Sequence, residues 1–169
     1  MEQNTKYKKF IIWGIGALVA LIVLLIINPL FIVDAGESAV ILKLGAVNRV
    51  EVEGMHWRIP FVESVKKLNV QTQVETIQAA SASKDLQTVS AEIALNYSLQ
   101  SEKVGELWQT VGSEYKVRII DPAIQDEVKA ATALFTAEEL ITKRHDVREK
   151  ILLSLRDRLS KNFINVENL

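Results

Sequence analysis

Residues 10–33 limit the fold more than any other feature: they read FIIWGIGALVALIVLLIINPLFIV and carry no charge. Thirteen of the eighteen residues from Phe10 to Ile27 are Leu, Ile, Val or Phe. Such a run favours bilayer insertion by about 4 to 8 kcal/mol. As a helix, residues 10–33 would extend about 36 Å, whereas the hydrocarbon core of a bilayer is about 30 Å thick. We therefore expect one transmembrane helix over residues 10–33.

The charges that flank this run predict its orientation. Three lysines precede it: Lys6, Lys8 and Lys9. Asp34 and Glu37 follow it. The positive-inside rule then predicts that the basic N-terminus, residues 1–9, is cytoplasmic and that the chain after residue 34 is extracytoplasmic.

A cleaved signal peptide is the alternative, because Val33, Asp34 and Ala35 resemble a cleavage site with small residues. A signal peptide carries an apolar stretch of only about 7 to 15 residues. The run in this chain is longer, which favours an uncleaved anchor.

Residues 34–169 are expected to form one domain, because about 135 residues are enough for a single hydrophobic core. The net charge of −1 indicates no basic surface of the kind that binds nucleic acid. The chain has no cysteine, which excludes disulfides, thiol catalysis and cysteine-based metal sites.

The first half of this domain is expected to form strands. Short apolar or alternating runs lie at residues 38–44, 47–52 and 65–77. The strongest strand is 89–99, in which the odd-numbered positions from Val89 to Leu99 are apolar and most even-numbered positions are polar. A period of two predicts a sheet with one buried and one solvated face.

The second half has helical periodicity. Val104, Leu107, Trp108 and Val111 share one helix face, and Gly112 is a plausible stop. A second helix is expected at 115–134.

The regular part of that second helix should begin near Asp121, because Pro122 fits only a first turn or a kink. A third helix is expected at 136–159, where Thr136 and Glu139 form a capping box. Residues 163–166 resemble the start of another strand. Strands followed by helices predict an α+β domain.

Catalytic chemistry is not indicated. The two histidines, His56 and His145, are far apart in sequence and belong to no metal-binding array. His145, Asp146 and Ser154 lie in one expected helix, but adjacent residues do not face the same way on a helix, and no Gly-x-Ser-x-Gly elbow is present. We therefore expect no enzyme, no cofactor and no metal.

Several short sequence motifs occur in order along the chain: Val33-Asp-Ala-Gly36, Gly54-Met-His-Trp57-Arg-Ile-Pro60-Phe61, Ser83-Lys-Asp-Leu-Gln87-Thr-Val89, Gly112-Ser-Glu-Tyr115 and Phe135-Thr-Ala-Glu-Glu-Leu-Ile-Thr-Lys-Arg144. This series resembles the prohibitin family, within the wider SPFH or band 7 group that includes stomatins, flotillins and the HflK and HflC proteins. The resemblance covers nearly the whole chain after about residue 30.

The resemblance implies a single N-terminal transmembrane helix and an SPFH/band 7 domain beside the bilayer. It implies a non-catalytic scaffold that assembles with prohibitin-like subunits, organises membrane microdomains with their lipids and modulates an FtsH-type AAA protease. We expect the cell membrane as its location, because an arginine-rich presequence is lacking; the mitochondrial inner membrane is the alternative.

Prohibitins continue into a long coiled coil, and this chain stops at Leu169 without a sustained heptad repeat. It is either a fragment or naturally short. In the second case, a monomeric, membrane-tethered module that binds a partner without forming rings is the alternative function. A membrane-anchored hydrolase using His145 or Ser154 is a third hypothesis, which the residues do not favour.

The segment between Gly54 and Pro60 has two interpretations. Trp57, Ile59 and Phe61 alternate, so they could point inward from a strand and its turn. They could instead form a membrane-facing apolar lip close to the anchor.

Overall fold

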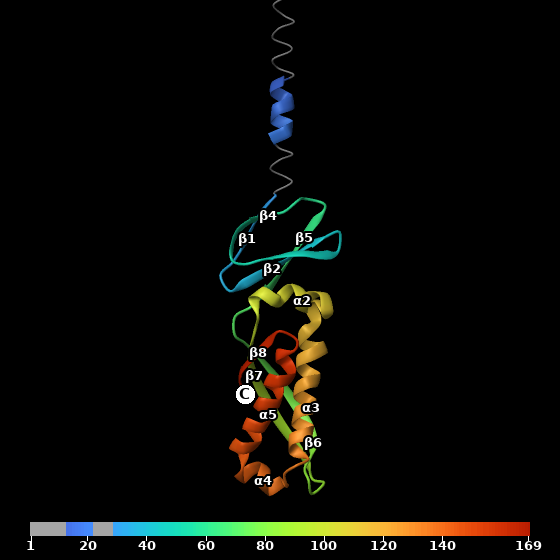
Figure 1. The fold of residues 1–169 in the computed structure, drawn as a ribbon, viewed down its shortest axis with the longest axis vertical. Coiled ribbons are helices and arrows are strands. Elements are labelled where there is room, and N and C mark those ends of the chain that lie inside the picture. Colours follow the sequence, from blue (N-terminus) through green and yellow to red (C-terminus); the bar gives the residue numbers. More distant parts are fainter. Residues whose placement is uncertain (1–12, 22–28) are drawn as a thin grey trace, which may run out of the picture.

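The computed structural model describes residues 13–21 and 29–169. Residues 13–21 are helical and lie within the apolar run (Figure 1). The expected basic N-terminus, residues 1–9, lies outside the described residues, and so do residues 10–12 and 22–28 of the expected transmembrane helix. In the two described ranges, no helix is both long enough and apolar enough to cross a bilayer. The transmembrane helix stays a prediction.

The prediction of a helix up to Val33 is wrong at its C-terminal end, because Leu30–Val33 form the strand β1. Pro29 directly precedes this strand, and proline removes an N–H and disfavours helical backbone at the residue before it. β1 pairs antiparallel with β4, Gly54–Trp57. The pairing draws the end of the apolar run into the folded domain.

The domain combines antiparallel sheets with helices, which confirms the predicted α+β class. Besides the β1–β4 ribbon, the described part contains two three-stranded sheets of order β3-β2-β5 and β6-β7-β8. Their strands are β2 Glu37–Lys43, β3 Ala46–Glu51, β5 Glu63–Asn69, β6 Gln73–Ala82, β7 Thr88–Leu99 and β8 Ile164–Asn168. Figure 1 shows the ribbon and the first sheet at one end, and the second sheet at the other.

The strand expected at 65–77 is in fact divided between β5 and β6. Asn69 ends β5, and its side-chain oxygen accepts a hydrogen bond from the N–H of Gln71 at 2.8 Å. Such a local bond lets asparagine stabilise a turn in place of a continuous ladder. The turn separates the two sheets, which therefore build the two ends of the domain.

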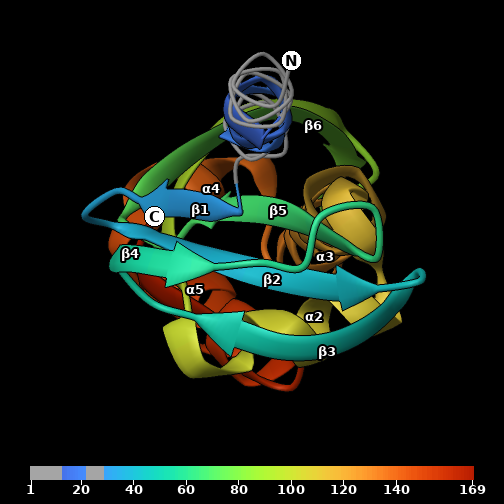
Figure 2. The same cartoon turned by 90° about the horizontal axis from the view of Figure 1, so that it is seen from above.

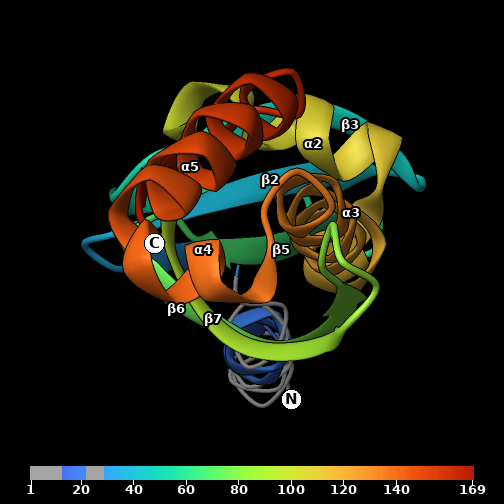
Figure 3. The ribbon, with the colours of Figure 1, turned by 90° about the horizontal axis from the view of Figure 1, so that it is seen from below.

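Within residues 29–169, the helices follow β7 in the chain. They are α2 Val104–Thr110, α3 Asp121–Thr132, α4 Ala137–Thr142 and α5 Arg144–Ser160, joined in part by the short turns η1 Ser101–Lys103 and η2 Gly112–Glu114 and the π-helical turn η3 Lys116–Ile120. Seen from below, α3 and α5 lie inside the curve of the β6–β7 hairpin (Figure 3). The apolar face of β7, with Leu95, Tyr97 and Leu99 buried, contributes to the shared core, as its period of two predicted.

α2 joins the two ends of the domain, because it packs beneath the first sheet (Figure 1). Gly105 permits this approach: a Cβ at this position would lie 2.7 Å from Cγ2 of Val50 on β3. Real Cβ atoms do not come so close to a neighbouring atom. A side chain at residue 105 would push α2 away from the sheet.

The single helix expected at 136–159 is interrupted at Lys143, where φ is −109° and ψ is 31°. The predicted capping box is confirmed: Thr136 Oγ1 accepts from the N–H of Glu139, and the Glu139 carboxylate accepts from the N–H of Thr136. The break leaves Arg144 exposed, although it lies on the expected apolar face. α5 then buries Val147, Ile151, Leu155 and Leu159.

Replacing Leu155 by alanine should lower the free energy of unfolding by about 2 to 5 kcal/mol, because the side chain is fully buried and its removal leaves a cavity. Leu153→Ala is the matched control, since Leu153 on the same helix is 56% exposed; its effect should stay within about 0.5 kcal/mol. Urea unfolding of the whole chain in detergent, followed by circular dichroism, measures both. Equal losses in the two variants would contradict the packing of α5.

Candidate functional site

The β1–β4 ribbon has one apolar face that nothing in the described part covers. Leu30 lies opposite Trp57, and Ile32 opposite Met55. These four side chains are 51% to 69% exposed. The alternate residues point the other way: Val33 is 2% exposed, and the ring of Phe31 lies 5.7 Å from that of His56. Figure 2 looks down on this ribbon.

The loop after β4 continues the exposed apolar face. Ile59 is 53% exposed and Phe61 is 93% exposed. Phe61 has a φ of 66°, a backbone conformation that costs a bulky residue about 1 kcal/mol or more. We call Leu30, Ile32, Met55, Trp57, Ile59 and Phe61 the apolar lip. The first interpretation, in which Trp57, Ile59 and Phe61 point inward, is wrong, because these side chains are 69%, 53% and 93% exposed.

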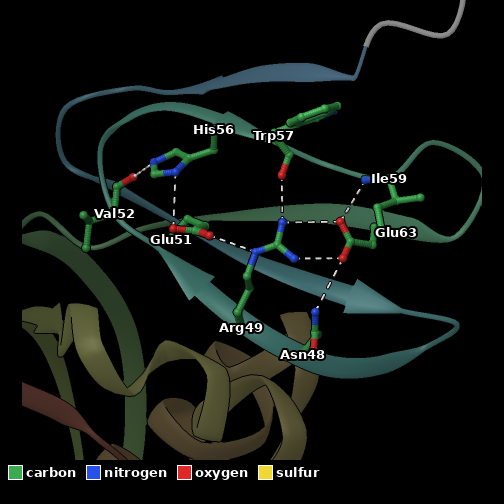
Figure 4. Close-up of polar contacts among 8 residues, drawn as sticks. All are labelled: Asn48, Arg49, Glu51, Val52, His56, Trp57, Ile59 and Glu63. Atoms are coloured by element: carbon green, nitrogen blue, oxygen red, sulfur yellow. Dashed lines mark hydrogen bonds and ion pairs between the residues drawn. The ribbon is translucent and has the colours of Figure 1, made fainter.

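Beneath the lip, Arg49 and Glu63 form an ion pair at the centre of a polar network (Figure 4). Arg49 Nη1 donates to Glu63 Oε1 at 2.8 Å, and Arg49 Nη2 donates to Glu63 Oε2 at 3.3 Å. The Glu63 side chain is only 2% exposed. Because β3 and β5 are the outer strands of their sheet, the pair connects the two sides of β2.

The same two side chains hold the backbone of the lip. Arg49 Nη2 donates to the carbonyl of Trp57 at 2.7 Å, and the N–H of Ile59 donates to Glu63 Oε2 at 2.9 Å. The segment that carries Trp57 and Ile59 is therefore fixed from below by charged groups. Such charge-assisted hydrogen bonds are about twice as strong as neutral ones.

The electrostatics of the pair keep it ionised. The hydrogen bond from Arg49 holds the pKa of the Glu63 carboxyl below its ordinary value of 4.5, and the bond from the N–H of Ile59 acts in the same direction. The bond to Glu63 raises the pKa of the Arg49 guanidinium. Both groups are charged at neutral pH.

His56 extends this network to the turn between β3 and β4. Its Nδ1 lies 3.2 Å from Glu51 Oε2, and its Nε2 lies 2.7 Å from the carbonyl oxygen of Val52. Both partners are hydrogen-bond acceptors. Glu51 in turn accepts from Arg49 Nε at 2.8 Å. His56 therefore lies in a polar cluster that positions β4.

The two histidines are not brought together by the fold. His56 lies on β4, whereas His145 lies in the first turn of α5 with its side chain 83% exposed. Among the described residues, no group of three His, Asp or Glu side chains could hold a metal ion.

Sequence reasoning found Trp57, Ile59 and Phe61 but missed the other half of the lip. Leu30 and Ile32 were assigned to the helix, and Met55 was not singled out. Arg49 and Glu63 were also missed. A charged residue within a short strand is a weak signal, and their contact depends on β3 and β5 lying on either side of β2.

Comparison with known proteins gives a consistent set of relatives. Residues 31–169 match the model of the SPFH domain / Band 7 family. The chain is similar to "Prohibitin-2" of Dictyostelium discoideum, with 30% identity over 146 residues, which cover 85% of this chain and 49% of that protein.

Two further relatives are similar to the same extent. "Mitochondrial prohibitin complex protein 1" of Caenorhabditis elegans is 31% identical over 79% of this chain and 50% of its own length. "Prohibitin-3, mitochondrial" of Arabidopsis thaliana is 33% identical over 77% of this chain and 49% of its own length. The chain spans about half the length of these curated relatives.

Replacing Glu63 by glutamine should make the domain less stable at neutral pH and less sensitive to acid. The pKa of Glu63 is lowered by folding, so its contribution is fully present above its ordinary pKa of 4.5 and is lost as the pH falls below that value. Urea unfolding of the chain in detergent between pH 3 and pH 7 measures this. The loss of stability on acidification should be smaller in Glu63→Gln than in the wild type.

Glu102→Gln, a change of an exposed carboxylate on η1, is the control and should keep the wild-type pH profile. An unchanged pH profile in Glu63→Gln would show that the pair with Arg49 does not stabilise the fold.

Proposed function

The chain belongs to the SPFH domain / Band 7 family, with prohibitins as its relatives. From this premise we propose that it is a non-catalytic, membrane-anchored scaffold of prohibitin type. In this function the residue 10–33 run attaches the domain to the bilayer. The domain then assembles with prohibitin-like subunits, organises a membrane microdomain and modulates an FtsH-type AAA protease.

The apolar lip is the observation that carries the membrane part of this proposal. Its first strand, β1, begins at Leu30, inside the apolar run itself. A chain that leaves a bilayer at this point would bring the lip directly to the membrane surface. Fully burying one large apolar side chain contributes about 1.5 to 3 kcal/mol, so partial burial of six would hold the domain against the lipid.

The position of Trp57 supports the same interpretation. Tryptophan is enriched where protein meets the membrane–water boundary, because its ring is apolar and its N–H is polar. Trp57 is 69% exposed on the outer face of the ribbon. In water, this large ring would have no apolar contact. In the interfacial region of a bilayer, its apolar ring can contact hydrocarbon while its N–H bonds to water or headgroups.

Self-assembly has weaker support within the chain. The printed name of the Caenorhabditis elegans relative refers to a prohibitin complex. The charge-mixed face of residues 143–161, which include α5, is the candidate for a lateral contact between neighbouring domains. Several of its charges are used internally: Arg158 pairs with Asp126 and Glu127 of α3, and Arg156 donates to carbonyls of β8. The monomeric tethered module therefore stays the alternative.

The membrane in which the protein acts is also part of the proposal. The sequence favoured a cell membrane, with residues 1–9 cytoplasmic and the domain extracytoplasmic. Several relatives carry the word mitochondrial in their names, which favours the alternative, the mitochondrial inner membrane.

A fluorescent label at residue 61 should enter the lipid. The chain contains no cysteine, so Phe61→Cys provides one labelling site. With an environment-sensitive dye in reconstituted liposomes, we expect a blue-shifted emission and quenching by lipids that carry a quencher near the headgroup.

Leu86→Cys is the matched control, because Leu86 is 89% exposed and also has a positive φ of 61°. It lies at the turn of the β6–β7 hairpin, at the other end of the domain (Figure 1), and its label should stay in water. Emission typical of water at residue 61 would refute the membrane contact of the lip.

The scaffold function predicts particles much heavier than one 19.0 kDa chain after extraction in mild detergent. Mass photometry and native electrophoresis measure this size. A species with the mass of one chain across a range of concentrations would instead support the monomeric tethered module.

A further inference from the structure

An open pocket lies beside the β1–β4 ribbon. Its volume is about 660 Å³, and its lining combines apolar side chains with two cations: Leu30, Phe31, Ile32, Met55, Val65, Arg58 and Lys67. The apolar wall comes from the ribbon and from β5. Residues of the apolar lip thus form one wall of the pocket, so the pocket opens beside the proposed membrane contact.

The two cations of the pocket differ in their partners. Lys67 Nζ lies 3.1 Å from Asp34 Oδ2 and 3.1 Å from Glu37 Oε2. Those carboxylates raise its pKa and compensate its charge. In residues 29–169, by contrast, no side chain is found in an ion pair with Arg58.

Arg58 also has an unsatisfied donor. Its Nε is buried and has no hydrogen-bond partner among the described residues. A buried donor left without an acceptor costs about 1 to 3 kcal/mol, so such a group usually marks a missing partner. The backbone of Arg58 is fixed, since its N–H donates to the carbonyl of Pro29 at 2.8 Å. The guanidinium thus lines the pocket without an ion-pair partner in residues 29–169.

The position of Arg58 in the chain connects it with the lip. It lies between Trp57 and Ile59, whose side chains are exposed, whereas Arg58 is half-buried. When those two neighbours contact lipid, the guanidinium lies directly behind them, at the level where phospholipid phosphates begin. A planar guanidinium binds phosphate oxygens through two parallel hydrogen bonds.

We propose that this pocket binds the headgroup phosphate of an anionic phospholipid, with Arg58 as the phosphate ligand and Leu30, Ile32 and Met55 against the adjoining hydrocarbon. The inference rests on the proposed membrane contact of the lip. A phosphodiester carries one negative charge, which matches the single cation that the pocket leaves uncompensated. The apolar wall selects a lipid over a free phosphate ion, because an ion gains nothing from hydrocarbon contacts.

The experiment compares three probes on the whole chain in detergent: short-chain phosphatidylglycerol, phosphatidylcholine of the same chain length, and inorganic phosphate. Native mass spectrometry counts the bound molecules as a function of concentration. The wild type should bind phosphatidylglycerol about tenfold more tightly than phosphatidylcholine. Arg58→Gln should lower the affinity for phosphatidylglycerol about tenfold, the effect of losing one charge-assisted contact, and should remove most of its preference over phosphatidylcholine.

Arg144→Gln is the matched control, because Arg144 is an exposed arginine on α5, outside the pocket. It should bind all three probes as the wild type does. Met55→Glu is a second variant for the case that Arg58→Gln fails to fold. Met55 is 68% exposed, so the change is tolerated, and its carboxylate should weaken phosphatidylglycerol binding by repelling the phosphate.

Wild-type affinity for phosphatidylglycerol in both pocket variants would overturn the proposal. Displacement of the lipid by inorganic phosphate at equal concentration would overturn its lipid part. The label at residue 61 separates this result from the proposed function. If the label enters the bilayer but Arg58→Gln does not change lipid binding, the pocket proposal alone is refuted. If the label stays in water but lipid binding depends on Arg58, the membrane contact of the lip alone is refuted.

Discussion

The ion pair between Arg49 and Glu63 is the interaction on which the lip end of the domain depends. It joins the two outer strands of the β3-β2-β5 sheet, and the same two side chains hold the carbonyl of Trp57 and the N–H of Ile59. A buried ion pair adds little stability over a well-packed apolar pair, but removal of one partner is costly. Its value here is positional, because it fixes the backbone of the segment that carries Trp57 and Ile59.

This arrangement explains how a small domain exposes so many large apolar side chains at one end. Phe61 has an unfavourable positive φ and is almost fully exposed. Backbone strain of this kind persists only where the surroundings over-determine the conformation, which is common at functional sites. The polar network provides that constraint from below. Arg58, between two lip residues, then points a cation into the pocket beside the same ribbon. An apolar surface backed by a fixed cation is the chemistry of a phospholipid interface.

Most of the regular elements could be predicted from local pattern. The alternation from Val89 to Leu99 predicted β7, and the capping box at Thr136 marked the start of α4, because both signals come from neighbouring residues. The failures have tertiary causes. Residues 30–33 continue an apolar run, so their pairing with β4 was not visible. The helix expected at 136–159 breaks at Lys143, because packing of Val147, Ile151, Leu155 and Leu159 decides the direction of α5.

Sequence alone determined most of the strands and helices, the apolar character of residues 10–33 and the resemblance to prohibitins, since these depend on composition and short spacings. Tertiary structure alone decided that Trp57 faces outward. The reason is that β4 pairs with β1, more than twenty residues earlier, in a ribbon whose outer face is left uncovered by the part of the chain that the structure describes. It also decided that Glu63 meets Arg49 and that no side chain in residues 29–169 forms an ion pair with Arg58. A contact between residues far apart in the chain produces no local sequence pattern. The apolar run could therefore be recognised from the sequence, whereas the complete apolar lip could not.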